Sequence, residues 1–239
     1  KHDDLWILRF FLSNKKTKTA IKAAKYTLEF RNNYMLDDKD IRDLPPHKVL
    51  EGNVHEYWQK RFQGDSVVCT VPDKRRGVII FLNAASMNPD AAKTLSDEAW
   101  MQAYMYTNEW CFQWLDHLTR TTGRLTKAVR FITMKGIEMS SIMDRASSKR
   151  DAKVAEEMED CYPQLVQTIF MIEPPSFVHL LWSFFRPIVP KRIMDKVDLI
   201  TPKTNESERQ RLFKHISIEN LPEDMGGCTV AKPVDWKIE

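Results

Sequence analysis

Residues 161–200 read CYPQLVQTIFMIEPPSFVHLLWSFFRPIVPKRIMDKVDLI, and this stretch predicts the elements around which the fold is built. Leu165–Ile172 is an apolar run with few polar breaks, which is typical of a central strand covered on both faces. After a proline break comes a helix that is apolar on nearly every side and leads into the basic segment 191–196. Such a helix lies either in a deep core or in the wall of a cavity that holds an apolar ligand.

Outward from this stretch, β-branched runs alternate with segments of helical periodicity. Ser96, followed by Asp97 and Glu98, is a typical start of a long helix, and Gly123 a typical end. The alternation predicts an α/β sheet with helices on both faces. The expected strands are 66–71, 77–83, 128–134, 165–172 and 197–200, and the expected helices are 4–31 with a polar break at 14–19, 96–122, 138–160, the apolar helix from 176, and 206–215.

Composition limits the class of protein. A chain of 239 residues can form one large domain with a small helical lobe, and a hydrophobic share of 43% argues against disorder. A net charge of +3 is too balanced to indicate a nucleic-acid partner. No apolar run reaches the roughly 20 residues that span a bilayer, so a soluble protein is expected. The chain begins at Lys1 rather than at methionine, so we expect residues upstream of it.

The cysteines and histidines give no sign of a metal site. Cys69, Cys111, Cys161 and Cys228 are scattered without a C-x-x-C pair, which indicates free thiols in a reducing compartment. The six histidines have no metal-ligand spacing, and the common catalytic and nucleotide-binding motifs are absent from the sequence. We therefore expect no metal, no cofactor and no catalytic residue.

Seven short motifs follow one another in the order found in CRAL-TRIO lipid-binding domains, which this chain resembles along nearly its whole length. Several positions depart from the family pattern. Within the motifs, Thr133 replaces an aspartate, Gln164 replaces an acid, and no proline follows Gly77; elsewhere, Asn14 replaces an arginine, Ile193 a threonine, and Ala128 and Arg130 two small hydroxyl residues. The motifs are DLWILRFFL at 4–12, EFR at 29–31, DKRRGVI at 73–79, TMKGI at 133–137, YP at 162–163, RP at 186–187 and LPEDMGG at 221–227.

The resemblance implies a particular architecture and function. The expected fold is a CRAL-TRIO-type mixed β-sheet that floors an apolar pocket, with helices on both faces. Residues 1–50 would form an N-terminal helical lobe, truncated in this sequence, and residues 51–239 the lipid-binding domain. Residues 176–196 would gate the pocket. The expected function is to bind a hydrophobic or amphiphilic lipid and to transfer or present it between membranes, as a cytoplasmic and peripherally membrane-associated protein.

The physics of lipid carriage agrees with this implication. An acyl chain of about 16 carbons, at about 0.8 kcal/mol per CH₂, costs about 13 kcal/mol to place in water. An enclosed apolar cavity removes this cost, and a mobile lid is needed because the ligand enters from the bilayer. The ligand class stays open among phospholipid, phosphoinositide, sterol, tocopherol-like and retinoid molecules. The expected partners are this lipid and, transiently, a membrane surface, with no nucleic acid.

The resemblance also implies pocket residues. Val178, Trp182 and Phe185 share one helical face at i, i+4 and i+7, as a pocket wall requires. The alternative is that these side chains belong to an ordinary core. The full set of pocket positions is Ala128, Arg130, Ile132, Ile169, Met171, Val178, Trp182 and Phe185.

A cationic patch is expected beside the gate. Lys15 and Lys196 fall where phosphatidylinositol-transfer members of the family contact the headgroup phosphate, and Arg186 and Arg192 lie nearby. Such a patch binds a phosphorylated inositol headgroup or an anionic membrane, or it is simply a solvated face. Gln164, in place of an acid, leaves inositol specificity open.

Arg130 is the unusual residue among the pocket positions. Alternation along the strand places it on the same face as Ala128 and Ile132. A buried arginine needs an anion, from a ligand or from an internal carboxylate. We expect Arg130 to meet an acidic headgroup or carboxylate of the ligand, the alternatives being an internal salt bridge or a register that exposes it.

Two rival functions remain at this point. One is a regulatory or membrane-docking interaction module that keeps the fold without exchanging lipid, which the departures at Thr133, Gln164 and Gly77 favour. The other is a small-molecule α/β enzyme, which would need a polar reactive cluster that the sequence does not contain.

Overall fold

The computed structural model describes residues 2–44, 67–70, 77–86, 90, 94–139, 145–185, 187, 189–201, 205–219 and 221–228, and every structural statement below refers to these. Three parts of the chain lie outside the described residues. They are the expected turn at 73–76, most of the connector between the N-terminal lobe and the sheet, and the side chain of Phe185.

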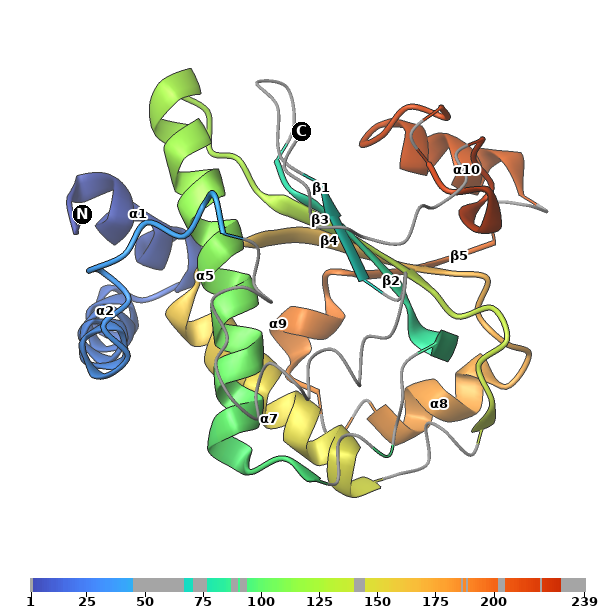
Figure 1. The fold of residues 1–239 in the computed structure, drawn as a ribbon, viewed down its shortest axis with the longest axis horizontal. Coiled ribbons are helices and arrows are strands. Elements are labelled where there is room, and N and C mark those ends of the chain that lie inside the picture. The colour runs from blue at the N-terminus through green and yellow to red at the C-terminus, as the bar shows by residue number, and fades with distance from the viewer. Residues whose placement is uncertain are drawn as a thin grey trace.

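A five-stranded sheet forms the centre of the molecule (Figure 1). Its spatial order follows the chain order, with β1 antiparallel to β2 and the four strands from β2 to β5 parallel. The expected antiparallel first pair and the βαβ alternation are therefore confirmed. The strands are β1 (Val67–Thr70), β2 (Ile79–Asn83), β3 (Ala128–Thr133), β4 (Val166–Ile172) and β5 (Val197–Ile200).

Two long helices make the crossovers between parallel strands. α5 (Asp97–Thr122) joins β2 to β3, and α7 (Arg145–Cys161) precedes β4. The predicted cap of α5 is confirmed, because the Ser96 hydroxyl accepts a hydrogen bond from the Ala99 amide at 3.2 Å and Gly123 ends the helix with a φ of 67°. The remaining elements are η1 (Ala84–Ser86), α8 (Val178–Phe185), α9 (Lys191–Met194), α10 (Glu206–Phe213) and η3 (Glu223–Met225).

The two faces of the sheet are packed by different parts of the chain. One face packs against α5 and α7, with Trp100, Trp110 and Leu115 among the buried side chains. The opposite face packs against α10 and the segment that follows it, and Figure 1 shows α10 across the sheet from α7, α8 and α9. Helices on both faces are what a mainly parallel sheet requires, since neither of its faces is left to water.

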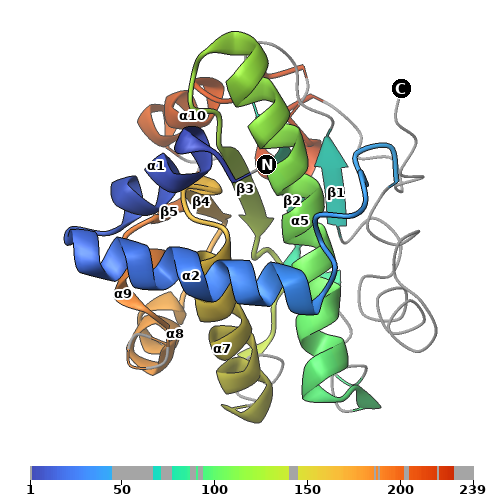
Figure 2. The same ribbon diagram turned by 90° about the vertical axis from the view of Figure 1, so that its left-hand side faces the viewer.

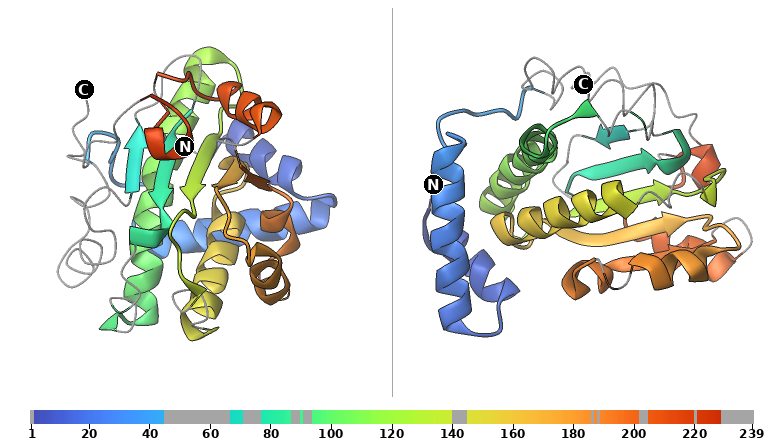
Figure 3. Two further views of the ribbon diagram at one scale, coloured as in Figure 1. Left: turned by 90° about the vertical axis from the view of Figure 1, so that its right-hand side faces the viewer. Right: turned by 90° about the horizontal axis from the view of Figure 1, so that it is seen from below.

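The N-terminal lobe is a pair of helices on the outer side of α5 and α7 (Figures 2 and 3). α1 (Asp4–Ser13) and α2 (Thr17–Asn33) are separated by a short break, as predicted from the polar segment 14–19. The break is shorter than predicted because α2 begins at Thr17. Arg9 of α1 donates hydrogen bonds to Asp116 and Thr119 of α5, which connects the lobe to the sheet domain.

In the LPEDMGG motif at 221–227, the last position has room only for glycine. Leu221 and Met225 are buried against the α10 side of the sheet. The chain then folds back so closely that a Cβ on Gly227 would lie 1.9 Å from the Leu221 carbonyl oxygen. Any side chain at this position would therefore displace the segment that covers this face of the sheet.

Candidate functional site

The predicted pocket positions of β3 and β4 share one face of the sheet. The parallel register pairs Arg130 with Ile169 and Ile132 with Met171, and it continues from these β4 residues to Val197 and Leu199 of β5. Ala128 lies on the same face, near the start of β3, and is buried. The expected grouping on this face is therefore present, and the register that would expose Arg130 on the other side is excluded.

This face is less completely covered than the opposite one. On the α10 side, the seven apolar side chains of β2 to β5 are at most 6% exposed. On the other side, six side chains of β2 to β5 are half-buried: Leu82, Arg130, Ile132, Met171, Val197 and Leu199. Of these, Leu82, Ile132 and Met171 lie on the inner strands β2 to β4, toward their carboxyl ends. The carboxyl end of a parallel sheet is also where ligands of open α/β folds bind.

α8 follows β4 directly and lies near this end of the sheet (Figures 1 and 3). Val178 and Trp182 on α8 are half-buried, which leaves part of each side chain accessible. The side chain of Phe185, the third predicted member of this helical face, lies outside the described residues.

Arg130 has one hydrogen-bond partner and no carboxylate among the described residues. Its Nη2 donates to Oδ1 of Asn108 on α5 at 3.1 Å, and its buried Nε has no partner. The internal salt bridge considered from the sequence is thus not found in the described part of the chain. Burial raises the pKa of the neighbouring Cys111 thiol to about 12, and the positive charge of Arg130 opposes that shift. Among the described residues, therefore, no carboxylate neutralises the Arg130 guanidinium at this half-buried sheet face.

The predicted cationic patch forms part of a cavity of about 240 Å³ between the lobe and the sheet domain. Both predicted cations that line it are already paired with carboxylates of α7. Lys196 Nζ lies 2.5 Å from Glu159, and Arg192 Nη1 lies 2.5 Å from Asp160. Lys15 is exposed and does not line this cavity, although its neighbour Asn14 does, and Arg186 lies outside the described residues.

Lys127 completes this cationic cavity and was missed from the sequence. It lies in the connection before β3, where no family motif or periodicity marks it, and no ion pair involves it among the described residues. Burial, together with the positive charges of Lys196 and Arg9, lowers the pKa of Lys127.

Gln164, which replaces the expected acid, has a φ of 63° and donates a hydrogen bond to Ser13 at 2.9 Å. It therefore joins the end of α7 to the end of α1.

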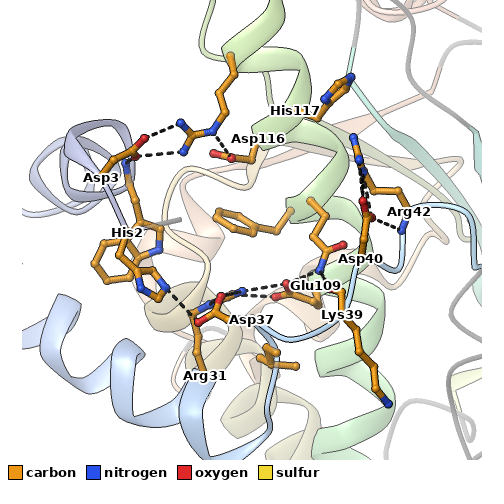
Figure 4. Close-up of a pocket in the computed structure, with 15 residues that line it drawn as sticks. His2, Asp3, Arg31, Asp37, Lys39, Asp40, Arg42, Glu109, Asp116 and His117 are labelled. Atoms are coloured by element: carbon orange, nitrogen blue, oxygen red, sulfur yellow. Dashed lines mark hydrogen bonds and ion pairs between the residues drawn. The ribbon is translucent and has the colours of Figure 1, made fainter.

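The cavity shown in Figure 4, of about 380 Å³, lies elsewhere, between the N-terminal lobe and α5. Its charged side chains largely satisfy one another. Arg31 makes two hydrogen bonds to Glu109, at 2.8 and 3.0 Å, and also contacts Asp37, while Arg120 bridges Asp3 and Asp116. The arrangement is a connection between two parts of the protein rather than an environment for an apolar ligand.

Neither these two cavities nor a third, of about 300 Å³ under α1, is lined by the predicted pocket residues of β3, β4 and α8 within the described part of the chain. Among the residues that the structure describes, no group of three or more His, Cys, Asp or Glu side chains is arranged to hold a metal ion. Nor is any helix in these ranges long and apolar enough to cross a bilayer.

Comparison with known proteins identifies the family. The CRAL/TRIO domain model matches residues 62–227, which is more than half of the sequence, so this chain belongs to the CRAL/TRIO domain family. The family comprises lipid-binding and lipid-transfer proteins, and this chain is a member of that class. The resemblance to this family is thus confirmed, and five of the seven motifs lie within the matched residues.

The fold is also found in a solved structure. The crystal structure of Sfh5 matches with a TM-score of 0.57, covering 97% of this chain and 77% of the Sfh5 chain, at 10% sequence identity. At that identity the likeness concerns the fold alone. A comparison with curated proteins gives no match.

Proposed function

We propose that this protein takes an amphiphilic lipid from one membrane, shelters it beneath residues 176–196 against the half-buried face of β3 to β5, and delivers or presents it at another. No bond is made or broken in this role. Residues 51–239 would form the lipid domain and residues 1–50 the lobe that supports it. The protein would work in the cytoplasm and associate peripherally with membranes.

The observation that carries this proposal is the unequal cover of the two sheet faces. Ile132 and Met171 sit on the adjacent inner strands β3 and β4 and are half-buried, as is Leu199 on the edge strand β5, while Phe131, Ile172 and Ile200 on the other face are at most 1% exposed. Apolar side chains in the middle of a domain normally pack to full density. An incompletely packed apolar floor beside an apolar helix is what a lipid-carrying pocket needs.

The position of Arg130 favours a ligand with an anionic group. A guanidinium on an apolar sheet face, with a single amide partner among the described residues, would be stabilised by an acidic group of a ligand. We propose that the ligand places a carboxylate or phosphate against Arg130 and Asn108. The half-buried floor around this pair would then hold the acyl or isoprenoid part.

Arg130→Met is expected to change which lipid the protein carries. Methionine fills similar space but has no charge, so the acidic ligand should fall at least about tenfold in occupancy, given about 1.5–3 kcal/mol for a hydrogen bond to a charged group. Mass spectrometry of lipids extracted from wild type, Arg130→Met and Arg130→Lys measures this. The lysine variant keeps the charge and should retain acidic lipid. An unchanged lipid profile in Arg130→Met would remove Arg130 from the site.

The cationic cavity would bind a headgroup phosphate only weakly in its present state, since Lys196 and Arg192 are paired. Glu159→Gln is therefore expected to raise the affinity for phosphoinositides about three- to tenfold, because it frees Lys196 at a half-buried site. Titration of a fluorescent short-chain phosphoinositide measures the change. Glu156→Gln is the control, since its exposed side chain makes no ion pair with a described residue. A weaker or equal affinity in Glu159→Gln would argue against headgroup binding in this cavity.

The same paired cations favour the second candidate, a regulatory module that docks on membranes or partners without exchanging lipid. Neutralisation of Arg192 and Lys196, with Gln164 in place of an acid, is the pattern expected where headgroup recognition has been lost. In this case the half-buried face would stay empty and no lipid would purify with the protein.

Lipid extraction from the purified protein, followed by mass spectrometry, decides between the two candidates. One equivalent of a single lipid class is the result expected for a carrier. Absence of lipid, together with failure to load from mixed vesicles, would overturn the carrier and leave the regulatory module. A neutral lipid in stoichiometric amount would keep the carrier and remove the anionic ligand proposed for Arg130.

A further inference from the structure

The outward face of α1 is apolar and uncovered. Ile7, Leu8, Phe11 and Leu12 are between 41% and 53% exposed. Their spacing of one and four residues places all four on a single stripe of the helix. An amphipathic surface helix of a globular protein normally exposes its polar face and buries its apolar face. A contiguous exposed apolar surface therefore generally marks an interaction site. The buried side chains of the helix, Trp6, Arg9 and Phe10, lie on its other side.

The segment that follows this stripe is basic and lacks acids. Residues 14–28, NKKTKTAIKAAKYTL, contain five lysines and no aspartate or glutamate. All five lysines are exposed, and no ion pair involves them among the described residues. On α2, Lys18, Lys22 and Lys25 follow one another at i, i+4 and i+7, next to the exposed Ile21, and so lie on one face. The five lysines are Lys15, Lys16, Lys18, Lys22 and Lys25.

These two features fit one kind of partner. An apolar stripe that ends in unpaired lysines matches the boundary of an anionic bilayer, where acyl chains and negative headgroups lie within one helix diameter of each other. A nucleic acid would attract the lysines but would gain nothing from four aliphatic and aromatic side chains. We propose that the N-terminal lobe docks on an anionic lipid surface through the α1 stripe and the lysines of residues 14–28. This docking goes beyond lipid carriage and does not depend on a bound ligand.

The docking surface adjoins the cationic cavity. Leu12, at the end of the stripe, lines both that cavity and the smaller one under α1. α1 and α2 lie together on one side of the molecule, seen face on in Figure 2. A protein held to the bilayer by this side would bring the opening beside Lys127 toward the headgroups.

Flotation of the 239-residue chain with vesicles tests the proposal. The vesicles contain either phosphatidylcholine alone or phosphatidylcholine with phosphatidylserine, at low and at high salt. One variant is Ile7→Ser/Phe11→Ser, whose two positions line none of the three cavities. The other is Lys18→Gln/Lys22→Gln/Lys25→Gln, which changes one exposed face of α2. Matched controls are Met35→Ser, at an apolar position that is 66% exposed at the end of α2, and Lys153→Gln, at an exposed position on α7.

Wild type and both controls are expected to bind the phosphatidylserine vesicles and to release at high salt. Partitioning should fall about 100-fold in the lysine variant and at least about tenfold in the apolar variant. Lipid extraction from both variants should match wild type, which separates failure of docking from failure of carriage. Three results would overturn the proposal: no binding by wild type, full binding by either variant, or a wild-type dimer that Ile7→Ser/Phe11→Ser dissociates, since the stripe would then join two copies of the chain.

Discussion

Arg31→Met is expected to lower the free energy of unfolding by about 3–5 kcal/mol. The side chains of Arg31 and Glu109 are 5% and 1% exposed, and two hydrogen bonds join them across the boundary between α2 and α5. Without the guanidinium, Glu109 keeps a hydrogen bond from Gln113 but no positive partner among the described residues. A carboxylate left buried and uncompensated costs far more than the pair contributes by itself. Urea unfolding followed by circular dichroism measures the loss.

Two further variants make this prediction specific to burial. Arg42→Met removes the arginine of a far more exposed pair, whose Asp40 side chain is 59% exposed, and should cost less than about 1 kcal/mol. Arg31→Met/Glu109→Met removes both charges and should regain much of the stability lost in the single variant. If the double variant were less stable than Arg31→Met, the pair would not be the source of the effect.

Ile132→Trp is expected to reduce the lipid bound per protein at least about tenfold. The position is half-buried on the proposed pocket floor, so an indole there occupies space that the ligand would need. Overpacking costs about 1–3 kcal/mol, and 1.4 kcal/mol corresponds to a factor of ten in binding. Lipid extraction and quantitative mass spectrometry of wild type and variant give the ratio.

The control for this experiment is Met35→Trp, which adds an indole at an exposed site on the N-terminal lobe. It should leave lipid occupancy unchanged. Urea unfolding of both proteins shows whether any loss of lipid in Ile132→Trp comes with a loss of stability. Equal lipid content in Ile132→Trp and wild type would mean that the ligand lies elsewhere, and the pocket floor would have to be assigned to other residues.

Much of the architecture was predictable because its signals are local. Val197–Ile200 was predicted as a strand at the observed bounds, and Ser96 and Gly123 were predicted as the ends of α5. Each rests on a few neighbouring residues: a β-branched run, a capping hydroxyl, a glycine with positive φ. The break in the N-terminal helices was placed correctly but was too long, because one turn of polar residues gives no sharp signal for where a helix restarts.

The site was predictable in part. Strand alternation placed Arg130 with Ala128 and Ile132, and the family resemblance placed Ile169 and Met171 in the same pocket. The register puts Arg130 and Ile132 beside Ile169 and Met171. The roles of these residues remain a proposal. Lys15 was expected in the phosphate site and does not line the cationic cavity, while Lys127, which does, was missed. Which residues line this cavity depends on the path of the loops between elements. Hydrophobic periodicity predicts helices and strands but not the path of a loop.

The sequence by itself determined the family, the order of elements and the sheet faces, because periodicity and short motifs are properties of neighbouring residues. Tertiary structure alone decided which charges cancel. Arg31 and Glu109 are 78 residues apart, and Lys196 meets Glu159 across 37 residues, so no local pattern announces either pair. It also decided that the described apolar strand residues are fully buried on one sheet face and in part only half-buried on the other, since burial depends on the shapes of side chains brought together from distant helices.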